Sequence, residues 1–509
     1  MTTITIIGGG IAGLTAAAQL AARGLRPLLL EADPSFVGGR LRGGPPVDLM
    51  GEDGRRWSFP GEHAVHGIWS PYLNLKALLA RHEIMPALVP SREETWIFGQ
   101  GRKVRMAAIG SAIRTSPVPA PFHYLFLLTR PRLLNMLSVW DLLSLVRVEG
   151  TLFSAMAIDP LAEGKALDSM TLADFMRGWS PTVRSLFAGL ARNALAANPE
   201  AAPAAGFIAF LRFYTLLRRD AWDFGYLPGT GGECIAEPLA AAACADGAII
   251  RLGCRVKRLE CEDDVWRVVY TDARGQEQAQ HSDRIVLALD APAARDLLLN
   301  SAPTVAVAAG LCFPPGVPTL IVRLWFRRSP RSIAASGICT GDLLVDNFFW
   351  LQQLQPAYQV WHKATGGSAL ETHIYGPSEV LAQLDAALLT QIILDIYRAF
   401  PELRGTLLHS VVLRNDATHT LFTPGDPARS LAVRTPWLGM VACGDWIADL
   451  NPAMYLERAT TTGMVAANHL LCELGLAPWP ILEHPAPEWF AGKLAAVLTR
   501  FRLAVHRRR

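Results

Sequence analysis

The sequence of 509 residues contains few charged side chains. Only 18% of the residues are charged and 51% are hydrophobic, whereas about 25% are charged in an average soluble domain. The net charge of +3 is too small to indicate a nucleic-acid-binding protein. The mean hydropathy of +0.22 fits a protein that contacts lipid or holds an apolar substrate.

Long uncharged runs are also missing. No run reaches the roughly 18 residues that a membrane-spanning helix needs, because Arg130, Arg132 and Asp141 interrupt the most apolar stretch, residues 122–146. Two interpretations of this stretch stay open. It is either a buried helical wall of a substrate tunnel or a monotopic membrane patch with arginines at the level of the headgroups.

The cysteines lack the spacing of metal or redox motifs. None forms C-x-x-C, and we expect buried free thiols in a reducing compartment; the eight are Cys234, Cys244, Cys254, Cys261, Cys312, Cys339, Cys443 and Cys472. No secretory leader precedes the first apolar segment, so a cytoplasmic location is expected. His63 and His66 have no cysteine or carboxylate set that completes a metal site, so no metal is expected.

The first forty residues carry the strongest positive signal. The apolar, β-branched residues 3–7 predict a buried parallel strand, and residues 8–13 (Gly-Gly-Gly-Ile-Ala-Gly) fit G-x-G-x-x-G. A helix is predicted over residues 14–22. A second strand over residues 28–30 ends on Glu31, which lies 18 residues beyond Gly13. This order of strand, glycine loop, helix, strand and acid predicts a dinucleotide site.

Each residue of this motif has a physical role. Gly8 permits the tight turn, Gly10 lets a pyrophosphate approach the backbone, and Gly13 lets helix and strand pack closely. The N–H groups of Ile11, Ala12 and their neighbours at the helix N-terminus, with its positive dipole end, attract the phosphates. Glu31 accepts hydrogen bonds from ribose hydroxyls.

Gly38, Gly39 and Arg40 extend the motif beyond Glu31. At this point the sequence resembles the FAD-containing amine oxidase and phytoene desaturase superfamily. The resemblance implies FAD rather than NAD as the cofactor, and it implies that Arg40 lies near the FAD pyrophosphate. It extends over nearly the whole chain and is most specific at residues 4–40 and 441–463.

A second motif comes near the end of the chain. Residues 441–446 (Val-Ala-Cys-Gly-Asp-Trp) predict a strand that ends at Gly444 and Asp445, followed by a helix that begins near Met454. The resemblance implies that Gly444 and Asp445 contact the FAD phosphates and ribityl group, and that the helix points its N-terminus at the flavin. Its dipole stabilises the negative charge of reduced flavin there.

The resemblance also implies roles for residues between these motifs. Residues 62–67 (Glu-His-Ala-Val-His-Gly), which include Gly67, match a segment beside the flavin, and the backbone of Val256 matches a contact to the adenine. No catalytic residue stands out. His66 and Trp446 are the flavin-side candidates, because of their position in the motifs.

The fold class predicted is α/β: a Rossmann-type FAD-binding domain interleaved with a substrate domain that is largely helical and contains a β-sheet. The FAD-binding segments are residues 1–75, 225–300 and 435–475. The substrate domain comprises a helical, membrane-facing region (76–224) and a second segment (301–434). The tail, residues 476–509, predicts a basic amphipathic helix that binds either an anionic membrane surface or its own domain.

Together these features predict a peripheral membrane enzyme that desaturates a polyprenoid. The segments Asp346–Trp350 and His373–Pro377 resemble those of carotenoid-modifying desaturases, including enzymes that form aromatic carotenoid rings. We expect hydride transfer from a carotenoid to flavin, with a quinone as a possible electron acceptor. The alternatives are a flavin amine oxidase, another lipid or isoprenoid flavin oxidoreductase, and a non-catalytic prenyl-binding escort on the same fold.

Overall fold

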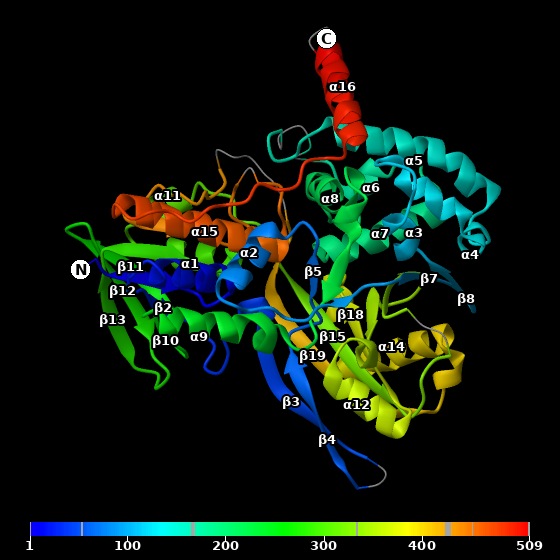
Figure 1. The fold of residues 1–509 in the computed structure, drawn as a ribbon, viewed down its shortest axis with the longest axis horizontal. Coiled ribbons are helices and arrows are strands. Elements are labelled where there is room, and N and C mark those ends of the chain that lie inside the picture. Colours follow the sequence, from blue (N-terminus) through cyan, green and yellow to red (C-terminus); the bar gives the residue numbers. More distant parts are fainter. Residues whose placement is uncertain are drawn as a thin grey trace.

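A computed structural model describes residues 2–51, 54–163, 167, 169–331, 334–422, 429–449 and 451–506. A five-stranded parallel sheet, in the order β10-β2-β1-β14-β20, forms the nucleotide-binding half (Figure 1). Its strands are β1 (Ile4–Ile7), β2 (Leu28–Leu30), β10 (Ile249–Arg251), β14 (Arg284–Leu287) and β20 (Met440–Ala442). The fold class α/β is thereby confirmed, with strands that come from both ends of the chain.

Helices cover this sheet. Helix α1 (Ile11–Ala21) is buried along its whole length, because α15 (Tyr455–Glu473) and α9 (Glu237–Ala245) pack against it. The π-helical turn η6 (Gly232–Ala236) leads directly into α9. A three-stranded antiparallel sheet adjoins this half and has the order β11 (Arg255–Glu262), β12 (Val265–Thr271), β13 (Glu277–Ser282).

The second half is built on a seven-stranded mixed sheet, in the order β19-β15-β18-β17-β16-β7-β8. The strands are β7 (Glu94–Gln100), β8 (Lys103–Ala108), β15 (Gly316–Phe326), β16 (Ser336–Gly341), β17 (Asn347–Trp350), β18 (Ser368–Ile374) and β19 (Leu407–Thr420). Helix α14 (Asp385–Ala399) packs its apolar side against one face, and α12 (Pro356–Thr365) covers the other together with the hairpin strand β4 (Arg56–Glu62). Strand β3 (Gly43–Met50) pairs with β4.

The region expected to be helical, residues 76–224, differs from the prediction at its start. After α2 (Leu73–Arg81), residues 94–108 form β7 and β8 and join the substrate sheet, where β7 pairs in parallel with β16. Gly101 takes a φ of 60° in the turn between them, and the Thr-Trp-Ile-Phe run before it has strong β-propensity. The helices follow from residue 110: α3 (Gly110–Arg114), η2 (Phe122–Thr129), α4 (Pro131–Leu134), α5 (Val139–Ala157), α6 (Leu172–Phe175), α7 (Pro181–Leu195), α8 (Ala204–Leu211) and the π-turn η4 (Arg212–Leu216).

Helix α5 and the C-terminal helix α16 (Trp489–His506) lie together at one end of the molecule (Figure 1). Thr499 and Arg502 donate hydrogen bonds to the carbonyl of Ala157, the last residue of α5, at 3.2 and 3.1 Å. Leu494 and Leu498 pack against the core, whereas Val497 and Phe501 are exposed. The tail helix therefore docks on its own domain along one face and leaves its other face free.

The burial of the cysteines differs from the expectation that the free thiols are buried. All eight, which all lie within the described ranges, are free thiols, but only Cys254, Cys339 and Cys443 are buried. Cys244, Cys261, Cys312 and Cys472 are exposed because they lie on the outer faces or at the ends of surface elements.

Candidate active site

The glycine loop between β1 and α1 has the geometry that the motif predicts. A Cβ on Gly13 would lie 2.0 Å from the carbonyl oxygen of Gly8, so only glycine lets α1 pack on the loop this closely. Gly8 has a φ of 105°, and a Cβ there would approach the carbonyl oxygen of Ala288 to 2.5 Å. At Gly10 the position of a Cβ meets no atom within 4 Å. The loop thus leaves open space at Gly10, at the N-terminus of α1.

Glu31 lies at the end of β2 beside this loop. Its two carboxylate oxygens accept hydrogen bonds from the N–H groups of Gly9 at 2.6 Å and Asp33 at 2.7 Å. The buried residues Ile11 and Ala12 start α1 immediately above. The acid, the loop and the helix N-terminus therefore meet at one place, as a dinucleotide site requires.

The segment with Gly38, Gly39 and Arg40 closes over the glycine loop. The N–H of Gly38 donates to the carbonyl of Gly9 at 2.8 Å, and a Cβ on Gly39 would lie 3.3 Å from the Cα of Gly10. The guanidinium of Arg40 then reaches across to Asp445, with 2.7 Å between Nη2 and Oδ2. Two motifs that are 405 residues apart in sequence are joined by this ion pair.

The C-terminal motif lies beside Arg40 and the glycine loop. Asp445 also accepts a hydrogen bond from the Thr420 hydroxyl at 3.0 Å, and the N–H of Gly444 donates to the Thr462 hydroxyl at 3.0 Å. Met454 is buried, takes an extended conformation and stands at the N-cap of α15. Tyr455 follows with a φ of 51°, which is uncommon for a residue with a side chain and marks functional positions in many proteins.

His66 faces the space between the two halves. Burial lowers the pKa of its imidazole to about 4, so the ring is neutral at physiological pH. The pKa of His419 is lowered to about 4 for the same reason. Both residues nevertheless keep part of their surface accessible, so they border space that other side chains do not fill.

Several polar atoms around this space are unsatisfied. His63 Nδ1, His66 Nδ1, His419 Nε2 and Asn415 Oδ1 are buried without a hydrogen-bond partner in the described part of the chain. Arg40 is close enough to His63, His66 and His419 to lower the pKa of all three. Buried polar groups without partners are rare in proteins, and each needs an explanation. The open cradle at Gly10, the acid Glu31 and these donors and acceptors together fit a flavin dinucleotide.

The other predicted residues lie in varied surroundings. Gly67 starts β5 (Gly67–Trp69), where a Cβ would approach the ring of Phe224 to 3.2 Å. Val256 lies on β11, the edge strand of its sheet, next to a register shift. The indole of Trp446 donates to the carbonyl of Leu289 at 2.8 Å and packs near Phe313, so this side chain belongs to the core of the nucleotide-binding half.

The structure places beside His66 a group of polar residues for which the sequence analysis predicted no role. Glu371 accepts hydrogen bonds from the Val65 N–H at 2.8 Å and from Arg323 Nε at 2.7 Å, and its pKa is influenced by His373. These residues come from β15 and β18, far from the motifs in sequence. One feature of the sequence could have indicated this group. Glu371, His373 and Tyr375 stand at every second position, so in a strand their side chains lie on the same face.

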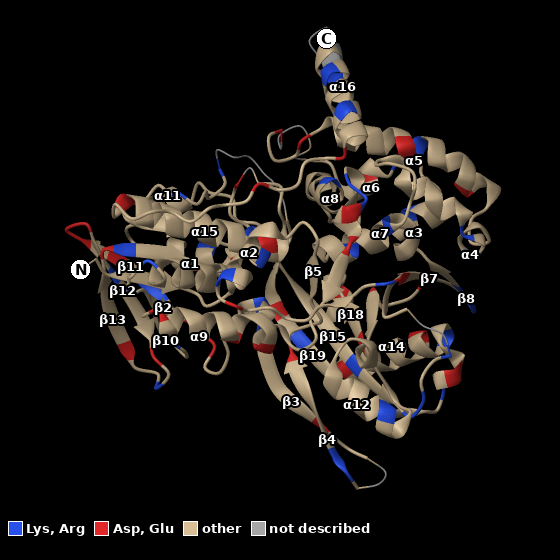
Figure 2. Ribbon diagram, viewed as in Figure 1, with Lys and Arg blue, Asp and Glu red and all other residues tan. Residues whose placement is uncertain are grey.

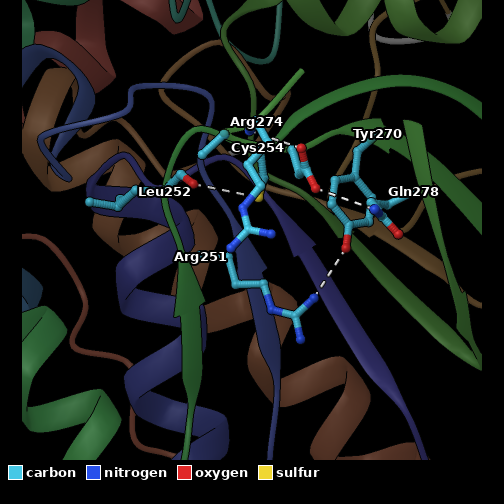
Figure 3. A pocket seen from close by; sticks show the side chains of 8 residues that line it. Arg251, Leu252, Cys254, Tyr270, Arg274 and Gln278 are labelled. Atoms are coloured by element: carbon cyan, nitrogen blue, oxygen red, sulfur yellow. Dashed lines mark hydrogen bonds between the residues drawn. The ribbon is translucent and has the colours of Figure 1, made fainter. Parts of the chain in front are cut away.

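Figure 3 shows a separate open pocket of about 370 Å³. It is lined by residues of β10, β12, β13 and the adjoining turns, among them Arg251, Cys254 and Tyr270. Arg251 donates to the Tyr270 hydroxyl at 3.1 Å. None of the eight lining residues belongs to the glycine loop or to residues 62–67, so this pocket is not the candidate active site.

Known proteins with similar sequences cover nearly the whole chain. The carotenoid phi-ring synthase of Chlorobaculum tepidum is 23% identical, covering 96% of this chain and 91% of its own length. The carotenoid phi-ring synthase of Streptomyces griseus is 26% identical, covering 93% and 88%. A 15-cis-phytoene desaturase from an Oncidium hybrid cultivar is 23% identical over 92% and 77%.

Solved structures show the same fold. Cyclohexylamine oxidase from Brevibacterium oxydans superposes with a TM-score of 0.64 at 17% identity, over 93% of this chain and 99% of that one. An oxidoreductase from Methanosarcina mazei superposes with a TM-score of 0.60 at 15% identity, over 91% and 99%.

The family model for flavin containing amine oxidoreductases matches residues 11–471. This range includes the helix that follows the glycine loop, Glu31, Arg40 and the Gly444–Asp445 motif. The likeness to carotenoid desaturases expected from the sequence is therefore confirmed, and the protein is an oxidoreductase enzyme with a flavin cofactor. The chain belongs to the flavin containing amine oxidoreductase family.

Proposed function

We propose that this enzyme is an FAD-dependent dehydrogenase that removes hydrogen from a hydrophobic polyprenoid, most specifically a carotenoid. The flavin supplies the oxidising power when bound, and the chain orients the substrate and keeps water away. FAD is favoured as the form of flavin because the dinucleotide cradle is complete. Glu31 at the end of β2 suits ribose hydroxyls and repels a 2′-phosphate.

The observation that carries the substrate class is a continuous series of aromatic rings that starts at the first residue of α15. Tyr455 lies 6.1 Å from Tyr214, which lies 4.9 Å from Trp69, and Trp69 stacks on Phe224 at 4.3 Å. The series continues through Tyr226 and Phe349 to His373, with neighbouring centroids 4.9 to 6.0 Å apart. Tyr214 and Tyr226 are buried and support the series from within the core, whereas Tyr455, Trp69, Phe224 and Phe349 keep part of their surface accessible. Accessible aromatic rings suit an apolar, conjugated substrate.

An amine substrate is the second candidate, supported by the fold shared with cyclohexylamine oxidase. A bound ammonium needs an anion or an aromatic cage. Glu371, the ionised carboxylate of this region, already pairs with Arg323 and His373. Because that carboxylate is occupied, it is not free to hold an ammonium, and this favours the polyprenoid over an amine bound by a carboxylate.

We propose that the enzyme receives its substrate at an anionic membrane surface. No helix in the described ranges is long and apolar enough to cross a membrane. Exposed apolar side chains gather on α5 and α16; they are Val139, Trp140, Leu142, Leu143, Val146, Trp489, Val497, Phe501 and Leu503. Arg132, Arg147, Lys493 and Arg500 are exposed around them. In Figure 2 charged residues occupy only a small part of these two helices. An apolar surface with cations at its border fits anionic headgroups.

The first test is an absorption spectrum of protein purified from membranes in mild detergent, followed by anaerobic mixing with substrates. We expect flavin bands, and bleaching of those bands by a carotene with β-rings but not by benzylamine. Bleaching by the amine alone would overturn the polyprenoid proposal. Reoxidation is then followed with a quinone and with oxygen in separate samples, since we propose a quinone as the electron acceptor.

A further inference from the structure

Three side chains on one face of β18 and its extension form a hydrogen-bonded chain. His373 Nε2 lies 2.7 Å from Glu371 Oε1, and the Tyr375 hydroxyl lies 2.9 Å from His373 Nδ1. An ionised carboxylate can only accept a hydrogen bond, so the Nε2 proton is directed to Glu371. Nδ1 is then the acceptor, and Tyr375 donates to it.

The surroundings keep Glu371 ionised. Burial by itself would raise the pKa of its carboxyl, but the adjacent Arg323 guanidinium and the hydrogen bond from His373 outweigh burial and hold that pKa well below its usual range. Glu62 shares the same guanidinium, with 3.2 Å between Oε1 and Arg323 Nη2, and burial raises its pKa to about 8. One buried cation therefore balances one anion, and that anion is Glu371.

The other end of the chain reaches the space that His66 borders. Tyr375 keeps part of its surface accessible, although burial raises the pKa of its hydroxyl well above the usual range. It is close enough to Tyr455 to raise the pKa of that hydroxyl as well. Tyr455 is the first residue of α15, whose N-terminus faces the cofactor cradle. The ring of Phe349, also partly accessible, lies 4.9 Å from His373.

Desaturation of a hydrocarbon releases a proton as well as a hydride. A bound flavin would accept the hydride, that is, one hydrogen together with the electron pair of its C–H bond. The C–H bond on the neighbouring carbon then breaks, its electrons form the new double bond, and its proton needs an acceptor. Where an apolar substrate fills the site and displaces water, the protein must supply that acceptor.

We propose that Tyr375, His373 and Glu371 form the relay that takes up this proton, an inference that rests on the proposed function. The substrate proton passes to the Tyr375 oxygen while the hydroxyl proton of Tyr375 passes to His373 Nδ1. The imidazolium that results is stabilised by ionised Glu371, which Arg323 and the Val65 N–H hold in place. His66 has no carboxylate within hydrogen-bond distance in the described part of the chain, and burial lowers its pKa to about 4, so it is a weak proton acceptor.

The test compares the wild type with Tyr375→Phe, which keeps the ring and removes the hydroxyl. We expect flavin content and the dissociation constant of the carotene to stay unchanged, and the limiting rate of anaerobic flavin reduction to fall by about 100-fold or more. Reduction of the wild type should be slower in D₂O, and this solvent effect should disappear in the variant. Tyr397→Phe, on α14, is the matched control and should behave as the wild type.

A readout independent of turnover is the ¹⁵N NMR spectrum of the His373 side chain. The wild type should show an Nε2–H tautomer with a hydrogen-bonded Nδ1, and Tyr375→Phe should lose the Nδ1 shift. Unchanged reduction kinetics in Tyr375→Phe, with the wild type active, would overturn the relay. If no carotene reduces the flavin of the wild type, the proposed function is overturned and the relay with it. This case is recognised because the wild type and Tyr397→Phe are then inactive as well.

Discussion

At the residue scale, Gly10 and Gly13 lie three positions apart and respond differently to the same added methyl group. At Gly13 the methyl group would collide with the backbone of Gly8, whereas at Gly10 it would enter open space. One glycine is thus required by the protein's own packing, and the other is required by what the loop binds.

We predict that Gly10→Ala folds normally and loses its flavin. The absorption ratio of flavin to protein should fall at least about tenfold, because the methyl group stands where the pyrophosphate approaches the backbone. The unfolding temperature of the flavin-free variant should match that of flavin-free wild type. Gly150→Ala on α5, which also has open space around it, is the control and should retain flavin. Full flavin content in Gly10→Ala would contradict the proposed position of the cofactor.

A second prediction concerns the pH dependence of stability through Glu62. The folded protein holds the Glu62 proton up to a pKa of about 8, whereas the unfolded chain releases it near the ordinary value of 4.5. The free energy of unfolding should therefore fall between pH 5 and pH 8, by roughly 1 kcal/mol per pH unit from this group. Glu62→Gln should remove that part of the slope and be more stable than the wild type at pH 8.

Urea unfolding at pH 5, 6.5 and 8 measures this effect. Glu371→Gln provides the contrast. It removes the ionised partner of the buried Arg323. The loss should be about 3 to 5 kcal/mol where Glu62 stays protonated, and smaller where Glu62, 3.2 Å from Arg323, ionises in its place. Parallel slopes for the wild type and Glu62→Gln would show that Glu62 is ionised in the folded protein.

The residues of the site differ in how far they could be predicted. Gly8, Gly10, Gly13 and Glu31 follow from spacing alone, because one strand, one turn and one helix place them. His419 and Tyr375 could not be placed in the same way. They reach the site only through the order of strands in the seven-stranded sheet, which depends on long-range pairings such as Val317 with His419 and Leu320 with Ile374.

At the scale of elements, the predictions were accurate where hydrophobic residues keep one spacing along a strand or a helix. They were poor where that spacing changes from the helical to the strand pattern. The buried strands β1 and β2 appear within one residue of the predicted bounds. Strands β7 and β8 were missed inside a region expected to be mostly helical. Their position at the edge of the sheet depends on the pairing of β7 with β16, a contact that local sequence does not encode.

Helices α5 and α16 give the third prediction. Replacement of Trp140, Val146, Val497 and Phe501 by serine should abolish flotation with vesicles that contain anionic phospholipid, because it removes the exposed apolar surface that would enter the headgroup layer. Leu384→Ser and Leu438→Ser, which also replace highly exposed leucines, are the matched controls and should still float. Equal binding by the serine variant would show that this surface does not contact the membrane.

At the scale of the whole molecule, the candidate site joins segments from residue 8 to residue 463. The ion pair between Arg40 and Asp445 and the hydrogen bond between Val65 and Glu371 connect the nucleotide-binding half to the C-terminal motif and to the substrate sheet. A ligand in this position contacts both halves, so its binding should stabilise them together.

The fourth prediction follows from this arrangement. Removal of the flavin should lower the midpoint of thermal unfolding by several degrees while the transition remains single, since a ligand at about 100 times its dissociation constant contributes about 2.7 kcal/mol. Adding FAD back should restore the midpoint in the wild type but not in Gly10→Ala. Differential scanning calorimetry measures both. Two separate transitions after flavin removal would show that the halves unfold independently.

The five strands of the parallel sheet are distributed from Ile4 to Ala442. During synthesis on the ribosome, β1, β2 and α1 emerge early. Strands β14 and β20 complete the sheet on the other side of β1, but β14 emerges only past the middle of the chain and β20 only near its end. The sheet beside the glycine loop therefore stays incomplete for most of the time that translation takes, and the apolar residues next to the loop stay exposed. A nascent chain with this arrangement depends on chaperones, and cells that produce it faster than they can shield it should accumulate it as aggregates.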